Sequence, residues 1–168
     1  MQDIVTGLGS AALARAWLEQ DEAVAALLVE VEACPGARED LYYPALLPAM
    51  VRAALGIGEL ELAERLVGDD EPRTPYAEHA LVAANAALTE AGADLQAAAD
   101  AYAGAAERWE RFGVVPEQAF ALLGQGRCLI GLSRPTEAAA VLQHARDIFE
   151  GLGATPALAD TDVLLAAA

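Results

Sequence analysis

The sequence predicts an all-α protein, built as a stack of antiparallel helical hairpins. Three short motifs return along the chain, and each is followed by a turn residue and then by an alanine: Ala53-Ala54-Leu55, Ala86-Ala87-Leu88 and Arg127-Cys128-Leu129. Their spacing of about 34 residues is typical of stacked helical hairpins. Alanine, the strongest helix former, occupies 41 of the 168 positions, which favours helix throughout. Because one hairpin cannot bury its apolar face alone, we expect a single array with an extended surface.

The first hairpin is expected at residues 10–34. Ser10 is the expected N-cap of its first helix, and Trp17 is expected in the core. Apolar residues then recur with helical spacing, at Val24, Leu27, Leu28 and Val31. The segment Cys34-Pro35-Gly36 ends the second helix, because proline and glycine both disfavour its continuation.

The second hairpin is expected at residues 44–67. Either Pro44 or Pro48 opens its first helix, which ends near Gly56 and Gly58. The short second helix has an inward stripe formed by Leu60, Ala63, Leu66 and Val67. The acidic run Asp69-Asp70-Glu71 breaks the pattern, and we expect it to be a solvated loop.

The third hairpin is expected at residues 75–112. Thr74 is the expected N-cap and Pro75 the first helical residue, and Asp94 caps the second helix after a turn at Gly92. That helix is long and amphipathic. Its expected buried stripe consists of Leu95, Ala98, Tyr102, Ala105, Trp109 and Phe112.

The fourth hairpin is expected at residues 116–151, with a capping helix at 156–168. Pro116 opens the hairpin, Ser133-Arg134-Pro135 forms its turn, and Gly151 and Gly153 end it. The expected inward stripe is Val141, Leu142, Ala145, Ile148 and Phe149. The first and last helices of the array are apolar on more than one side, which allows self-association end to end.

Charge and composition exclude several classes of partner. The net charge is −16, with ten arginines and no lysine, so that we expect no direct binding of nucleic acid. The absence of lysine excludes P-loop and Schiff-base chemistry. No apolar stretch reaches the roughly 18 residues of a membrane span, and the N-terminus lacks the basic region of a secretory signal. We therefore expect a cytoplasmic protein without a membrane partner.

No group of residues in the sequence has the pattern of a catalytic, metal or cofactor site, so that we predict a protein that is not an enzyme and has no cofactor. His79 and His144 are far apart and lack a neighbouring ligand pair. Cys34 and Cys128 are isolated, as expected of two buried thiols in a reducing compartment. Ser133 has a helix-turn-helix context and is expected to be a turn residue rather than a nucleophile.

Two further patterns are assigned to structure rather than to ligands. The glycine pairs Gly7-x-Gly9 and Gly124-x-Gly126 do not continue as a phosphate-binding motif, and we expect the second pair to allow close helix packing. The cluster Asp160-Thr161-Asp162 lacks the spacing of a calcium loop, and we expect a solvated loop there as well.

The repeated turn residue and the alanine five positions later resemble the tetratricopeptide signature, in which a small residue closes the first helix and an alanine lets the second helix pack. The pairs are Gly58 with Ala63, Gly92 with Ala97, and Ser133 with Ala138. The interval from Gly92 to Ser133 is seven residues longer than the interval from Gly58 to Gly92. Seven residues are close to two helical turns, so that the longer hairpin keeps the direction of its buried face. This resemblance implies a tetratricopeptide-like α-solenoid.

A second resemblance covers the chain from Pro44 to Leu165. Residues 123–129, 134–138, 145–149 and 152–153 look like the C-terminal repeat region of large bacterial regulators, in which a nucleotide cyclase or a LuxR-type DNA-binding domain is joined to a P-loop ATPase and a long helical-repeat arm. The resemblance implies a setting in signal transduction or transcription regulation. The chain is then either an arm of such a protein, with ATPase and output domains attached, or a stand-alone relative.

The tetratricopeptide resemblance also implies a binding groove. Its register places ten residues on the concave side: Pro48, Arg52, His79, Val82, Ala86, Thr89, Phe120, Leu123, Arg127 and Ile130. An apolar trough between Arg52 and Arg127 suits a protein or peptide segment with apolar anchors and a carboxylate, because arginine offers two parallel hydrogen bonds. We therefore expect a non-catalytic protein-interaction or regulatory module. The alternative is a sensor that binds a small-molecule effector in the same groove.

Overall fold

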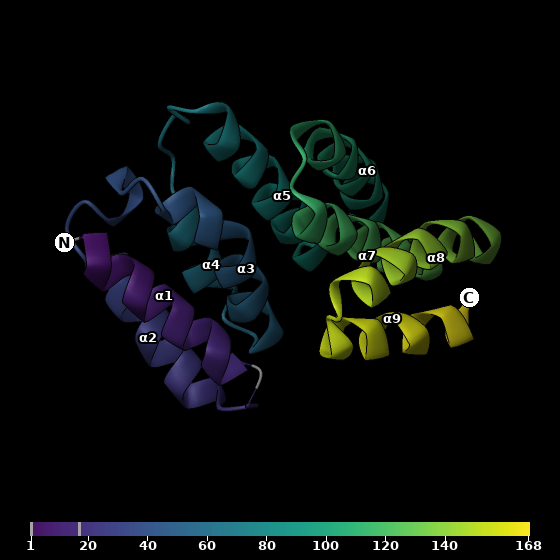
Figure 1. Cartoon of the computed structure of the whole chain (residues 1–168), viewed down its shortest axis with the longest axis horizontal. Coiled ribbons are helices and arrows are strands. Elements are labelled where there is room, and N and C mark those ends of the chain that lie inside the picture. Colours follow the sequence, from purple (N-terminus) through teal and green to yellow (C-terminus); the bar gives the residue numbers. More distant parts are fainter. Residues whose placement is uncertain (1, 17) are drawn as a thin grey trace. The chain divides into compact units, whose positions relative to one another are not determined.

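The computed structural model describes residues 2–16 and 18–168, and all of its regular elements are helices (Figure 1). They are α1 (Gln2–Ala16), α2 (Asp21–Ala33), the 3₁₀ helix η1 (Ala37–Glu39), α3 (Tyr43–Gly56), α4 (Leu60–Val67), α5 (Pro75–Ala91), α6 (Leu95–Phe112), α7 (Val115–Gly131), α8 (Pro135–Leu152) and α9 (Thr155–Ala167). The predicted all-α class is confirmed for this part of the chain. Trp17, expected in the core, lies outside the described residues.

The chain divides into two compact units, Met1–Ala91 (unit 1) and Gly92–Ala168 (unit 2). In unit 1, α1 packs against α2 and α3, and α3 packs in turn against α4 and α5. In unit 2, α7 packs against both α6 and α8, and α9 packs against α8. The two helices of the hairpin predicted at residues 75–112 belong to different units, so that this hairpin and the single repeat domain stay predictions.

Most of the predicted helix ends are confirmed. Asp94 accepts a hydrogen bond from the N–H of Ala97 at 3.1 Å, and Thr74 accepts one from the N–H of Ala77 at the same distance. Gly113 follows α6 in the left-handed conformation, with φ of 86°. Ser133 also has a positive φ, 59°, and lies in the turn before α8, as expected of a turn residue.

Two predictions about helix ends are wrong. Ser10 is not an N-cap, because α1 begins at Gln2 and continues through Gly7 and Gly9. Asp160-Thr161-Asp162 is not a loop but part of α9, where Thr161 is buried and donates a hydrogen bond to the carbonyl of Ala157 at 2.7 Å. The choice between two prolines is also resolved, since Pro44 lies in the first turn of α3 and Pro48 inside the helix.

The predicted core stripes are confirmed except at their ends. Tyr102 and Trp109 of α6 are buried, but Phe112 is 44% exposed, because it is the last residue of the helix, where the chain turns towards α7. In α4, Leu60 is the first helical residue and is exposed, whereas Leu62 is buried. The remaining members of the predicted stripes of α4 and α8 are buried or half-buried.

Glycines bring the helices of unit 2 close together. A methyl group on Gly124 of α7 would overlap the ring of Tyr102 of α6, and one on Gly126 would overlap the side chain of Leu142 of α8. These two residues face different neighbours because they are two positions apart on the helix. The predicted packing role of the Gly124-x-Gly126 pair is confirmed.

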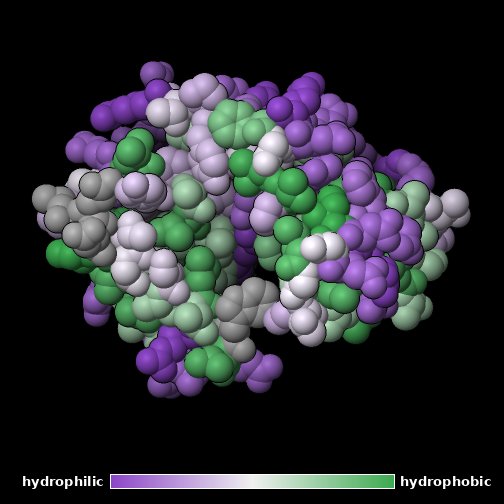
Figure 2. Space-filling view, in the orientation of Figure 1, coloured by the Kyte–Doolittle hydropathy of each residue, from purple (hydrophilic) through white to green (hydrophobic). Residues whose placement is uncertain are grey.

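Apolar side chains also reach the surface. Figure 2 shows hydrophobic residues in patches among hydrophilic ones on the visible face. Among the large exposed apolar residues are Leu41 in unit 1 and Val163 in unit 2. Within residues 2–16 and 18–168, no helix combines the length and the apolar character needed to cross a membrane.

Candidate functional site

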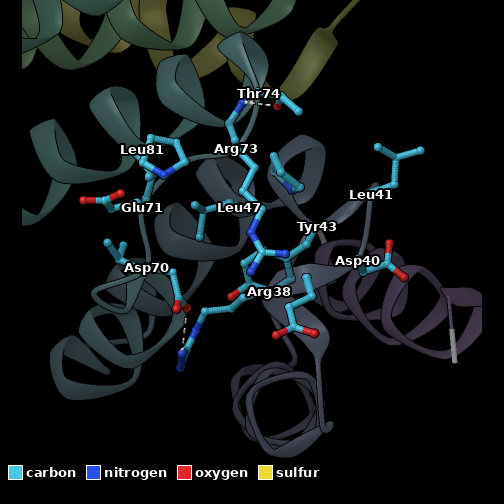
Figure 3. A pocket seen from close by; sticks show the side chains of 15 residues that line it. Arg38, Asp40, Leu41, Tyr43, Leu47, Asp70, Glu71, Arg73, Thr74 and Leu81 are labelled. Carbon is cyan, nitrogen blue, oxygen red and sulfur yellow. Dashed lines mark hydrogen bonds and ion pairs between the residues drawn. The ribbon is translucent and has the colours of Figure 1, made fainter.

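Unit 1 contains a pocket of about 230 Å³ between η1, the start of α3 and the linker formed by residues 68–74 (Figure 3). The start of α5 completes its wall. The apolar lining is formed by Leu41, Tyr43, Pro44, Leu47, Val67, Pro72, Ala77 and Leu81. The polar lining is formed by Arg38, Glu39, Asp40, Asp70, Glu71, Arg73 and Thr74. The pocket therefore combines an apolar interior with charged side chains.

Arg38 joins η1 to the opposite wall of the pocket. Its guanidinium lies 3.4 Å from Asp70 Oδ2 and donates a hydrogen bond to the carbonyl of Arg65 at 3.1 Å. The side chain of Arg38 passes over Gly68, where an added Cβ would lie 2.9 Å from the guanidinium carbon of Arg38. Gly68 also has φ of 61°, a conformation that glycine adopts without strain. Glycine at this position thus permits both the turn of the linker and the position of Arg38.

Tyr43 is a buried residue of the pocket lining. Its hydroxyl donates a hydrogen bond of 2.6 Å to the carbonyl of Leu66, near the end of α4, and its side chain is buried. Burial raises the pKa of Tyr43 from 10.0 to about 12, although the nearby charge of Arg38 acts in the opposite direction. Tyr43 therefore stays protonated at neutral pH and serves as a fixed donor that ties α3 to α4.

We expect the raised pKa of Tyr43 to make the folded protein less stable at alkaline pH. The folded state holds the Tyr43 proton up to about pH 12 whereas the unfolded state loses it near pH 10, so the contribution is complete below pH 10 and is lost as the pH rises. Linkage gives a loss of about 1 kcal/mol by pH 11. Urea denaturation of the wild type and of Tyr43→Phe at pH 8 and 11 measures the loss, because the variant lacks it and all other groups cancel. An equal change in both proteins would contradict the assignment.

Arg73 is the second arginine of the pocket. It precedes Thr74, the N-cap of α5, and Figure 3 shows its side chain extending into the pocket. Arg73 makes no hydrogen bond or ion pair with any described residue of the chain. The pocket thus contains one arginine fixed by protein partners, Arg38, and one that is available to a ligand.

The residues predicted for a groove lie elsewhere. Arg52 is on α3, and His79, Val82, Ala86 and Thr89 lie along α5, all in unit 1; Phe120, Leu123, Arg127 and Ile130 lie along α7 in unit 2. None of them lines the pocket. Since the residues belong to two units, a common groove stays a prediction.

Two of the predicted groove residues have a packing role. The ring of Phe120 meets the ring of Phe149 of α8 edge to face, with centroids 5.0 Å apart, and Leu123 is buried. Arg127, in contrast, is exposed. The apolar part of the predicted set on α7 therefore contributes mainly to the core of unit 2.

Sequence reasoning missed the pocket, although the linker carries a signal. Residues 68–74 separate α4 from α5 by seven positions, whereas Gly113-Val114 suffices between α6 and α7. Five of the seven linker residues are charged or proline: Asp69, Asp70, Glu71, Pro72 and Arg73. A long linker of this composition is a candidate wall of a binding site.

The ionisable groups of the pocket are described by their partners and their protonation. Tyr43, the most strongly perturbed group of its lining, is held in its neutral form, which makes it a hydrogen-bond donor and not a base. Across the described residues, no cluster of three or more His, Cys, Asp or Glu side chains is placed to hold a metal ion. Comparison of the chain with family models, with curated proteins and with solved structures found no match.

Proposed function

We propose that this chain is a non-catalytic regulatory module that binds a small ligand in the pocket of unit 1. One observation carries the proposal: the pocket combines an apolar interior with a guanidinium, that of Arg73, that has no partner among the described residues. A few polar groups in a mainly apolar recess are typical of small-molecule sites. The volume of about 230 Å³ lies below the roughly 300–1,000 Å³ of sites for drug-sized ligands, which favours a small effector.

The pocket connects parts of unit 1 that are distant in the sequence. A ligand there would touch η1, α3, α5 and the 68–74 linker at once. Binding energy would then favour the arrangement in which these elements are closest to the ligand. In the antiparallel hairpin stack that we propose for the chain, such a change would pass to neighbouring repeats, and then to the attached ATPase and output domains implied by the resemblance to bacterial regulators.

Ligand-dependent stabilisation of a pocket-filling variant tests this function. We expect Ala77→Trp, whose side chain would occupy the pocket, to lose the stabilisation that small metabolites give to the wild type in a thermal-shift screen. A ligand at 100 times its Kd stabilises by about 2.7 kcal/mol, an easily measured shift. Ala140→Trp, on the exposed face of α8, is the control and should respond like the wild type. Equal stabilisation of Ala77→Trp, or no stabilisation of the wild type by any compound, would contradict the proposal.

A second candidate function is the binding of a protein segment, the function expected first from the sequence. The exposed Leu41 and Tyr42, 71% and 53% accessible, favour it, because they lie beside Pro44 and Tyr76 in a shallow cleft next to the pocket. Exposed aromatic and aliphatic side chains of this kind serve as anchors for partners. Peptides enriched by display on the wild type should lose binding to Leu41→Glu; peptides that bind both proteins equally would exclude this surface.

A further inference from the structure

The charged side chains that line the pocket differ in whether they have a partner within the protein, and this difference indicates the class of its ligand. Asp70 is paired with Arg38, and Asp40 accepts a hydrogen bond of 2.8 Å from the N–H of Tyr42. The other two carboxylates, Glu39 and Glu71, are exposed, and Figure 3 shows Glu71 directed away from Arg73. Arg73, an exposed residue at the pocket, therefore has no carboxylate partner among the described residues, although the four carboxylates of the lining outnumber its two arginines.

Two helix N-termini contribute positive potential to the pocket beside Arg73. α3 begins at Tyr43 and α5 begins at Pro75, and the first turns of both helices line the pocket. The N-terminus of a helix carries a partial positive charge that favours an anion within the first turn. The overall charge of −16 acts from farther away, and at physiological ionic strength charges beyond about 8 Å are largely screened. The lining itself carries four carboxylates and two guanidiniums, so that an anion is favoured only in direct contact with Arg73 and the helix N-termini.

The apolar surface limits which anion fits. The side chains of Leu47, Val67 and Leu81 line the pocket and have no hydrogen-bond donors. A fully polar anion such as inorganic phosphate would leave this apolar surface in contact with water. An apolar group beside the anion would instead cover it. A planar carboxylate matches the guanidinium of Arg73 through two parallel hydrogen bonds.

We propose that the pocket of unit 1 binds a small apolar carboxylic acid, with the carboxylate on Arg73 and the aliphatic or aromatic group against Leu47, Val67 and Leu81. This inference rests on the proposed function and names the ligand class of the same pocket. The same chemistry occurs at the C-terminal residue of a protein. The free acid is the assignment here, because the volume of about 230 Å³ suits a whole small molecule.

Matched acids and amides test the inference. Titration calorimetry with 3-phenylpropanoic acid and 4-methylpentanoic acid, and with the two corresponding primary amides, compares ligands that differ in charge and little in shape. We expect the acids to bind about ten- to a hundredfold more tightly than the amides. In Arg73→Gln this preference should disappear, while Arg111→Gln, an exposed arginine at the end of α6, should keep it.

The outcomes separate the inference from the proposed function. Amides that bind as tightly as acids, or an acid preference that survives in Arg73→Gln, would overturn the claim that Arg73 binds the carboxylate of the ligand. The pocket would still be a ligand site. Loss of binding in Ala77→Trp verifies that the pocket is the site measured. If acetyl-Gly-Gly-Phe with a free C-terminus bound tenfold more tightly than 3-phenylpropanoic acid, the carboxylate would come from the C-terminal residue of a protein. The assignment of a free acid would then be wrong. If neither the four compounds nor any metabolite of the thermal-shift screen bound, both proposals would fail.

Discussion

Replacement of Trp109 by alanine is expected to destabilise unit 2 by about 3–5 kcal/mol, the usual cost of truncating a large buried aromatic side chain. Trp109 has none of its surface exposed and is the largest of the fully buried residues that the structure describes. Small domains are stable by only about 5–15 kcal/mol, so this loss is a substantial fraction of the total stability. Urea denaturation followed by far-UV circular dichroism measures the change.

Phe112 provides the matched control for this prediction. It lies three residues farther along α6, and its ring meets that of Trp109 edge to face at 6.3 Å, but it is 44% exposed. We expect Phe112→Ala to cost about 1 kcal/mol, the contribution of the ring contact and a partly buried side chain. Similar losses for the two variants would contradict the buried position of Trp109.

Introduction of a side chain at Gly124 is expected to have the second largest effect. Gly124→Val would place its Cβ on the ring of Tyr102, which is buried. Overpacking of this kind costs about 1–3 kcal/mol, and we expect the upper end because an aromatic ring is rigid. The free energy of unfolding in urea measures the loss.

Gly104 of α6 is the matched control, since a Cβ there would have no atom within 4 Å. Gly104→Val should change the stability by less than about 0.5 kcal/mol, because valine has a slightly higher helix propensity than glycine and nothing opposes it. If Gly124→Val were as well tolerated as Gly104→Val, the close approach of α6 and α7 would be wrong.

The helix ends of this chain could be predicted because they depend on local chemistry. Asp94 and Thr74 cap their helices with hydrogen bonds that span three residues, and Gly113 adopts a conformation that most residues avoid. Such signals are contained in a few neighbouring residues and need no knowledge of the fold. The all-α class followed from the motif spacing of about 34 residues and from the alanine content.

The start of α1 could not be predicted in the same way. Serine is a preferred N-cap residue, which led to the expectation that the helix starts at Ser10, whereas Gly7 and Gly9 before it reduce helix propensity. In the structure Gly9 is buried, and an added Cβ there would lie 2.9 Å from the side chain of Leu46 in α3. Packing of α1 on α3 therefore offsets the cost of glycine, and this contact joins residues far apart in the chain.

The pocket depends even more strongly on tertiary structure. Arg38 and Asp70, which join its two walls, are separated by 32 positions, and no periodic pattern relates them. The acidic run at residues 69–71 was expected to be a solvated loop, and its residues are indeed exposed. That prediction omitted the wall that the linker forms opposite η1. The expected groove was derived from a register of helices, which contains no information about a linker.

Gly68 makes it possible to control the pocket indirectly, because it is not among the residues that line it. A single methyl group at this position would displace the guanidinium of Arg38 and so release Asp70. The identity of residue 68 is therefore a diagnostic marker: chains that combine a larger residue here with arginine at position 38 would lack the bridge between the two walls. Screening variant libraries at this one position would separate the shape of the cavity from the chemistry of its lining.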